Sequence, residues 1–300
     1  MNQKPLVSVI MNCYNGQQFL NEALDSLVEQ TYKNWELVFW DNKSDDDSIN
    51  IFNSYNDKRF KLYSAPNHTI LYEARNKAIK KASGELIAFL DTDDYWSPNK
   101  LEKQVKLFED NKVNLVYGNF WIVNESSYFK KRIFTSKKLP TGKVLKSLLS
   151  EYTVGLLTIM LRKKSLKNFD EMFNTKYDLL ADYDFVLRFS VDNYFECIQE
   201  PVACYRIHKN NMSNLEKEKQ ISQLKSWFNS IKSDSVFSSQ KEIGDVYERI
   251  KYMEVLNLIL EKNFFKGFYE AIKFPIGIKK IKLFLALCLP KSVFLNLKKF

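Results

Sequence analysis

The stretch Glu85 to Asp94, ELIAFLDTDD, decides the fold because it joins an apolar strand directly to a cluster of carboxylates. The apolar run predicts a strand over 85–90, and Asp91, Asp93 and Asp94 follow it at once. Three carboxylates at one strand end repel each other unless a cation or several hydrogen-bond donors compensate. Oxygen ligands suit Mg²⁺ or Mn²⁺, which commonly bind one or two carboxylates together with substrate phosphates. The alternative is an Asp-rich turn with a helix cap ahead of Pro98.

Strand-like and helix-like segments alternate around this stretch. Apolar runs predict strands over 6–11, 36–40, 60–63 and 85–90. Apolar residues at helical spacing predict helices over 17–30, 48–55 and 71–82, and Pro98 is suited to open another. Such alternation is typical of an α/β fold with a mostly parallel sheet and helices on both faces, in which ligands bind outside the carboxyl ends of the strands. This position favours a metal site over a simple turn at 91–94.

The second half of the chain has a looser pattern. Beyond about residue 115 we expect shorter strands, loops and helices, and from about residue 215 onward almost only helices. The boundary near 215 is soft, because no Gly-, Pro- or Ser-rich stretch marks it.

Composition limits the class of protein. In 300 residues, 45% hydrophobic and 27% charged residues indicate a globular chain. The four cysteines have no close spacing, which fits a reducing compartment better than a disulfide framework. The first residues lack the pattern of a secretory signal, and no segment approaches 18 apolar residues in a row. Nearly all of the net charge of +9 lies in 261–300, which holds nine Lys against two acidic residues, so we expect no nucleic-acid partner.

Two further groups of residues could carry chemistry. Asp182 and Asp184 lie at an expected helix start, where Asp182 could cap the helix and Asp184 could be solvated. On the residues alone this structural interpretation is favoured over a general base, which would need to lie near an acceptor hydroxyl. The two histidines are His68 and His208, and a lone histidine is more often structural than a ligand.

Five segments in series resemble glycosyltransferase family 2, the inverting enzymes with the GT-A fold. The resemblance covers about residues 5–213 and rests on five segments in family order. They are VSVIMNCYN at 7–15; EQTY at 29–32 followed by ELV at 36–38; the run of ARN at 74–76, ASGE at 82–85 and FLDTDD at 89–94; DYD at 182–184 with Arg188; and YRIH at 205–208. Each segment alone is weak, but their order and distances together are specific.

The resemblance implies a role for each matching residue. Asp91 would contact the nucleotide ribose, and Asp93, with Asp94, would hold Mg²⁺ or Mn²⁺ on the diphosphate. His208 would complete the metal or phosphate site, and Asp182 would be the base for the incoming hydroxyl. The remaining roles concern the nucleotide: Tyr14 and Asn15 would line its site, and Arg75 would steady the pyrophosphate.

Two departures from the family pattern stand out. The family often has two adjacent acids after its second strand, whereas this chain has Asp41-Asn42. An amide can donate to and accept from a pyrimidine edge, so uridine binding stays possible and the identity of the base stays open. Glutamate is also common before the catalytic aspartate, where this chain has Ala181, and we expect less electrostatic support there.

The expected activity is transfer of a hexose or related sugar from a UDP or dTDP donor to a hydroxyl of a glycan or lipid-linked acceptor, as in cell-surface polysaccharide assembly. Residues 1–215 would form the GT-A catalytic domain, with the nucleotide-sugar part at about 1–118 and the acceptor part at about 119–215. The alternative is a non-catalytic carbohydrate-binding or scaffold protein of the same fold. Such a protein would be expected to lose acids from the site, and all four of Asp91, Asp93, Asp94 and Asp182 are present.

The C-terminal region 216–300 combines apolar residues with lysines. From Phe264 onward it is dense in Phe, Leu and Ile, and Pro275, Gly277 and Pro290 divide it into pieces too short to span a bilayer. Such pieces can lie in a membrane interface with their lysines on anionic head groups. We therefore expect a cytoplasmic enzyme, peripheral on the cytoplasmic face of the membrane; the alternative is a helix packed on the catalytic domain.

Overall fold

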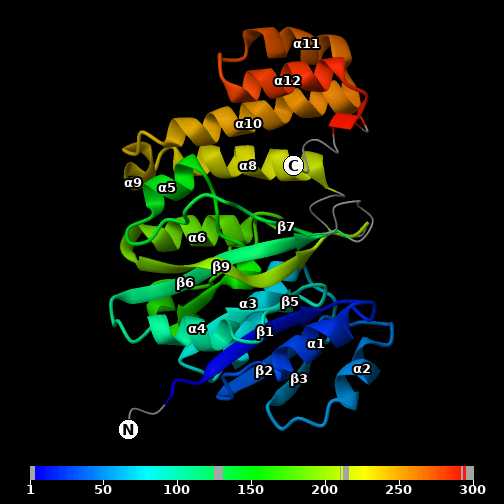
Figure 1. Cartoon of the computed structure of the whole chain (residues 1–300), viewed down its shortest axis with the longest axis vertical. Coiled ribbons are helices and arrows are strands. Elements are labelled where there is room, and N and C mark those ends of the chain that lie inside the picture. The colour runs from blue at the N-terminus through cyan, green and yellow to red at the C-terminus, as the bar shows by residue number, and fades with distance from the viewer. Residues whose placement is uncertain (1–3, 125–130, 210, 212–215, 292, 295–300) are drawn as a thin grey trace. The chain divides into compact units, whose positions relative to one another are not determined.

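The computed structural model describes residues 4–124, 131–209, 211, 216–291 and 293–294. The chain divides into two compact units, Met1–Leu148 with Tyr152–Asn211 and Leu149–Glu151 with Met212–Phe300. In Figure 1 the first unit runs from blue to yellow-green, and the second, apart from its short green segment 149–151, from yellow to red. Each is described by itself.

The first half of unit 1 alternates strands and helices as predicted. Its elements are β1 (Val7–Cys13), α1 (Leu20–Val28), β2 (Trp35–Asp41), α2 (Ser48–Ser54), β3 (Phe60–Ser64), α3 (Leu71–Lys81), β4 (Leu86–Phe89), β5 (Tyr95–Trp96) and α4 (Lys100–Leu107). The predicted strands and helices are thus confirmed to within a few residues. One detail differs: Pro98 does not open a helix. It lies in a turn closed by a hydrogen bond from the Lys100 amide to the Ser97 carbonyl, and α4 starts at Lys100.

The remaining elements up to residue 211 are shorter and less regular. They are β6 (Val113–Val123), β7 (Lys131–Ile133), α5 (Leu145–Ser150), η1 (Leu156–Thr158), β8 (Met160–Arg162), η2 (Lys163–Leu166), α6 (Ala181–Asp192) and β9 (Tyr194–Arg206). The sheet has the order β3-β2-β1-β4-β8-β6-β9-β5, with β7 paired to β6. Strands β1 to β4 pair in parallel, whereas β8, β5 and β7 each run antiparallel to their neighbours.

The two faces of β1 are covered by different helices. One face packs with α1, α2 and α4 in a common core, which includes Met11, Leu24, Phe39, Phe52 and Leu101. The other face contacts α3, which also lies against β2. The parallel strands β1, β2 and β4 are therefore buried on both sides, which explains their almost continuously apolar sequences.

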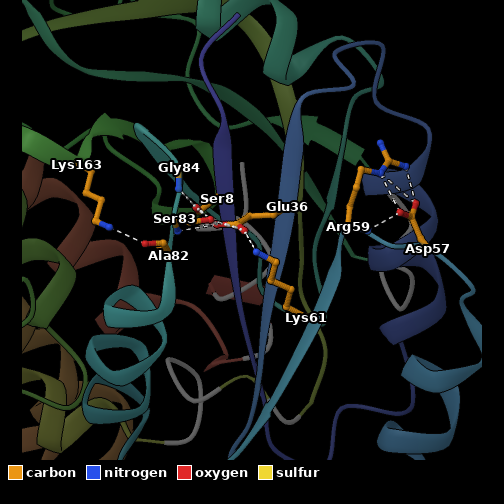
Figure 2. Close-up of polar contacts among 9 residues, drawn as sticks. All are labelled: Ser8, Glu36, Asp57, Arg59, Lys61, Ala82, Ser83, Gly84 and Lys163. Atoms are coloured by element: carbon orange, nitrogen blue, oxygen red, sulfur yellow. Dashed lines mark hydrogen bonds and ion pairs between the residues drawn. The ribbon is translucent and has the colours of Figure 1, made fainter.

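A buried carboxylate ties together the amino-terminal ends of the parallel strands. Glu36 of β2 accepts hydrogen bonds from the Ser8 hydroxyl at 2.5 Å and from the Ser83 amide and hydroxyl at 2.7 Å, and it pairs with Lys61 of β3 (Figure 2). Gly84 donates its amide to the Ser8 hydroxyl at 2.8 Å. These contacts fix one edge of the sheet, at the opposite end of the strands from Asp91.

Unit 2 is helical, as predicted for this region. It contains α8 (Lys217–Ile231), α9 (Ser235–Ser238), α10 (Ile243–Asn257), the short π-helix η3 (Leu258–Lys262), α11 (Phe264–Lys273) and α12 (Ile278–Cys288). A small apolar core joins α10, η3, α11 and α12 through side chains such as Leu256, Ile259, Ala271 and Leu283. Among the described residues, no helix combines the length and the apolar character that crossing a bilayer requires.

Candidate active site

The acid triplet lies at the carboxyl end of β4. The Leu90 amide donates to the Ile10 carbonyl at 3.1 Å, so the chain stays paired with β1 up to the triplet. The side chains of Asp91 and Asp93 are about one-third exposed, at 33% and 31%, whereas Asp94 is buried. Two carboxylates are therefore accessible at the edge of the sheet where ligands bind in α/β folds.

Each carboxylate of the triplet has a partner from a different element. Asp91 pairs with the Arg75 guanidinium of α3, and the Asp93 Oδ2 atom lies 2.8 Å from His208 Nε2. Asp94 accepts the Arg206 amide hydrogen at 2.9 Å. Burial, reinforced by the neighbouring acids, raises the pKa of Asp93 and raises that of Asp94 well above its usual range. The repulsion among the acids is thus real and only partly compensated by these partners.

Arg206 anchors the loop that carries the triplet. Its Nε donates to the Asp93 carbonyl at 3.1 Å, its guanidinium pairs with Glu22 of α1, and it lies 4.5 Å from the centroid of the Phe19 ring. No pattern in the sequence had indicated a role for this buried arginine. Together with the neighbouring His208, it connects the end of β9 to the triplet.

Asp93 and His208 fit a divalent cation. Carboxylate oxygen and imidazole nitrogen are both accepted by Mn²⁺, and Mg²⁺ commonly uses few protein ligands plus substrate phosphates. Across the described residues, no three His, Cys, Asp or Glu side chains gather to hold a metal ion. The structure thus brings Asp93 and His208 together, while the Asp94 carboxylate is buried on the Arg206 amide. A cation here would depend on ligands from the donor.

A second connection runs from the triplet to the predicted base. The buried Arg75 pairs with Asp91, and its guanidinium lies 5.0 Å from the centroid of the Tyr72 ring. The Tyr72 hydroxyl donates to Asp182 Oδ1 at 3.0 Å. Burial raises the pKa of Asp182, and the Arg75 charge and the Tyr72 hydrogen bond oppose that rise. Asp182 is consequently a stronger base than a solvated aspartate and is held in position by α3.

The start of α6 corrects one structural interpretation. Leu180 takes the N-cap position, and Asp182 lies in the first turn with its side chain bonded to Tyr72. The prediction that Asp184 could be solvated is wrong, because Asp184 is buried and its Oδ2 accepts a hydrogen bond from Arg188 Nε at 2.9 Å. Asp184 and Arg188 can pair because their i, i+4 spacing places both side chains on one face of the helix. Of the two acids, Asp182 is the one directed to the Arg75 side.

The loop after β1 is preorganised beside the triplet. Asn15 has a positive φ of 53°, and its amide donates to the Ser44 hydroxyl at 3.0 Å. A Cβ atom added at Gly16 would lie 2.9 Å from the Thr92 hydroxyl, so the β1 loop and the triplet loop approach closely. Tyr14 is exposed, and its ring centroid lies 4.1 Å from that of His68. This arrangement leaves an aromatic face available at the end of β1.

The pair after β2 is engaged in loop contacts. Asp41 Oδ1 accepts the Ser44 amide at 3.1 Å, and Asn42 Nδ2 donates to the Thr69 carbonyl at 2.7 Å. His68 Nδ1 lies 3.1 Å from the Asn42 carbonyl oxygen. Sequence reasoning gave His68 little weight, and its place beside Tyr14 and Asn42 comes only from the structure. Tyr72 was also missed, although its position one helical turn before Arg75 was a usable signal.

Comparisons with known proteins identify the family of this chain. Residues 8–169 match the model of the family described as Glycosyl transferase family 2. The chain is 35% identical over 211 residues to the UDP-Glc:alpha-D-GlcNAc-diphosphoundecaprenol beta-1,3-glucosyltransferase WfgD of Escherichia coli, covering 70% of this chain and 80% of WfgD. It is 28% identical over 232 residues to the putative teichuronic acid biosynthesis glycosyltransferase TuaG of Bacillus subtilis, a match that covers 76% of this chain and 88% of TuaG.

Solved structures agree on the fold. TarS of S. aureus (residues 1–349, in complex with UDP) superimposes with a TM-score of 0.63 at 19% identity, covering 93% of this chain and 77% of the other. The mannosyltransferase PcManGT of Pyrobaculum calidifontis, in complex with GDP-Man and Mn2+, superimposes with a TM-score of 0.63 at 18% identity. The match covers 99% of this chain and 86% of PcManGT. The chain therefore belongs to glycosyltransferase family 2, has the GT-A fold and is a glycosyltransferase.

Proposed function

We propose that the protein is a metal-dependent, inverting enzyme that moves a hexose or related sugar from a UDP or dTDP donor to a hydroxyl of a glycan or lipid-linked acceptor. The observation that supports this most is the chain of contacts Asp91–Arg75–Tyr72–Asp182. It connects acids at the end of β4 with a carboxylate of raised pKa at the start of α6. A transferase needs these two functions, donor binding and proton removal, in one site.

The donor end uses residues of three elements. Asp93 and His208 would hold Mg²⁺ or Mn²⁺ beside the donor diphosphate, Arg75 would steady the pyrophosphate, and Asp91 would contact the ribose. When bound, the ion neutralises the negative charge that develops on the leaving diphosphate. Residues 14–15 line the nucleotide, with the exposed Tyr14 ring beside it.

Asp182 acts on the acceptor. As a carboxylate it accepts the proton of the incoming hydroxyl while the oxygen attacks the anomeric carbon from the face opposite the leaving diphosphate, which inverts the configuration. The Tyr72 hydrogen bond fixes the orientation of the carboxylate. Burial raises the pKa of Asp182 and so makes its carboxylate more basic, and the Arg75 charge limits that rise.

A lipid-linked acceptor is supported by the relatives. WfgD and WfaP of Escherichia coli are glucosyltransferases acting on a diphosphoundecaprenol-linked sugar, and WfaP is 33% identical over 174 residues of this chain. An acceptor of that class is anchored in a membrane. We accordingly place the enzyme on the cytoplasmic face, held there through region 216–300, in the assembly of a surface polysaccharide.

The test separates donor binding from proton removal. Purified wild type, Asp93→Asn and Asp182→Asn are compared for thermal stabilisation by UDP and dTDP sugars with Mn²⁺, and for transfer to a lipid-linked sugar. We expect Asp93→Asn to lose the Mn²⁺-dependent stabilisation. Asp182→Asn should keep it and lower turnover by about 10²-fold or more, the usual scale for a lost general base.

Asp192→Asn is the matched control, because Asp192 is an exposed acid at the other end of α6. It should behave as wild type in both assays. Full wild-type transfer in excess chelator would contradict the metal, and a product of retained anomeric configuration would contradict the role of Asp182. A wild type without transferase activity towards any donor would instead favour a carbohydrate-binding protein.

A further inference from the structure

Helices α11 and α12, with the connection 274–277 between them, present an exposed apolar face in unit 2. Phe265 is 84% exposed, Ile276 97% and Ile278 73%. Tyr269, Ile272 and Ile281 are also exposed, and we call these six residues the hairpin face. Monomeric soluble proteins rarely expose so many large apolar side chains within so short a segment, and such patches mark interaction sites.

The hairpin face is not the side on which these helices fold. Ala271 of α11 and Leu283 of α12 are buried in the core that they form with α10 and η3. A Cβ atom added at Gly267 would lie 2.7 Å from the Ile259 side chain, so α11 already packs closely on η3. At 100° per residue, Phe265, Tyr269 and Ile272 fall on the opposite side of α11 from Gly267 and Ala271. The local core is therefore complete without the exposed side chains.

The segment that carries the hairpin face is rich in lysine. Residues 264–291 hold six lysines and one acidic residue, Glu270. Lys266 and Lys282 make no ion pair with any residue for which the structure gives contacts. Lys273 Nζ lies 3.8 Å from the centroid of the Tyr269 ring, at the edge of the face. An apolar stripe with cations beside it is the arrangement of a helix that lies in a membrane interface.

We infer that the hairpin face binds a bilayer surface that carries anionic head groups. The apolar side chains enter the boundary between head groups and acyl chains, and Lys266, Lys273 and Lys282 contact the lipid phosphates. A second copy of the chain is a less suitable partner for the hairpin face, because its own lysines would lie against the lysines of the first copy and repel them. The inference deepens the proposed function by naming the surface and the lipid charge that bring the enzyme to a lipid-linked acceptor.

The experiment is co-sedimentation of the full chain with vesicles that contain no sugar acceptor, either pure phosphatidylcholine or phosphatidylcholine with 30% phosphatidylserine (roughly the charge density of an anionic leaflet). The apolar variant is Phe265→Ser/Ile276→Ser/Ile278→Ser, and its control is Leu62→Ser/Val236→Ser, which removes exposed apolar side chains elsewhere. The charge variant is Lys266→Gln/Lys273→Gln/Lys282→Gln, and its control is Lys33→Gln/Lys58→Gln/Lys112→Gln at exposed positions.

Wild type and both controls should bind anionic vesicles. The apolar variant should bind at least about 10-fold more weakly, from the loss of three inserting side chains, and the charge variant should lose the preference for phosphatidylserine. Equal binding by wild type and the apolar variant, or no binding by wild type, overturns the inference. If wild type forms dimers without lipid and the apolar variant is monomeric, the hairpin face binds a second copy of the chain instead. Mn²⁺-dependent stabilisation by nucleotide sugars, measured on the same variants, shows separately whether the donor site stands.

Discussion

Removal of the Glu36 charge should destabilise unit 1 in a pH-dependent way. Burial alone would raise the pKa of this carboxyl, but hydrogen bonds from Lys61, Ser8 and Ser83 outweigh it and lower the pKa from 4.5 to about 2. Each pKa unit corresponds to about 1.4 kcal/mol of differential interaction, so the ionised form contributes about 3 kcal/mol to folding at neutral pH. Glu36→Gln keeps the shape of the side chain and removes that contribution.

The pH range follows from the two pKa values of Glu36. Because its pKa is lower in the folded state than in the unfolded chain, the stabilisation is fully present above about pH 5 and is lost as the pH falls towards 2. By pH 3, about 2 kcal/mol of the contribution should be gone. Wild type and Glu36→Gln should therefore differ strongly at pH 7 and much less at pH 3.

Urea unfolding followed by circular dichroism at pH 7, 5 and 3 measures this difference. Glu109→Gln, at an exposed acid on the same unit, is the control and should track wild type at every pH. The difference between wild type and Glu36→Gln is the informative quantity, because other acids titrate in both proteins. A difference that stays constant from pH 7 to pH 3 would refute the role of the Glu36 charge, whatever its size.

Two further predictions concern other buried groups. Tyr72→Phe removes a hydrogen bond that lowers the pKa of Asp182. The acidic limb of the pH–turnover profile should therefore move to higher pH, while thermal stabilisation by the donor is kept. An acidic limb that does not move would argue against positioning of Asp182 by Tyr72. Lys100 is fully buried with Nζ 2.6 Å from Gln104 Oε1, and burial holds its pKa well below the usual range. The unfolded chain then binds a proton that the folded protein does not. In urea unfolding, the free energy of unfolding of wild type relative to Lys100→Met should therefore rise between pH 8 and 10, by up to about 1.4 kcal/mol per pH unit. If the difference between the two proteins does not change with pH, Lys100 is not neutral in the folded state.

The sequence predicted strands β1 to β4 well and the later strands of the sheet poorly. Strands β1, β2 and β4 are buried on both faces, so their sequences are continuous apolar runs that stand out against the neighbouring helices. Strands β7 and β8 have three residues each, too few for any periodicity to be recognised. The long strand β9 contains Pro201 at an irregular register against β6, which breaks its pattern.

The sequence named candidate site residues but could not predict the contacts among them. Asp93 and His208 are 115 positions apart and Tyr72 and Asp182 are 110 apart, so spacing in the sequence carries no information on either pair. The burial of Asp94 also has no sequence signal, because it arises when the Arg206 amide of β9 closes over it. Only the resemblance to a family placed these acids in one site beforehand.

We propose that the acid triplet serves ligand binding and not stability. An isolated turn could use serine or asparagine at these positions without repulsion. Here Asp91, Asp93 and Asp94 lie within four positions; burial and Asp91 raise the pKa of Asp93, and burial, Asp93 and Asp91 raise that of Asp94. Three different elements, α3, β9 and the segment after β9, supply Arg75, the Arg206 amide and His208 to offset part of this cost. Perturbed carboxylates at the carboxyl end of a strand are the arrangement expected where a protein must bind a cation and its phosphates. The amino-terminal edge shows the contrast: there the single acid Glu36 is fully satisfied and has a lowered pKa, as a purely structural carboxylate should.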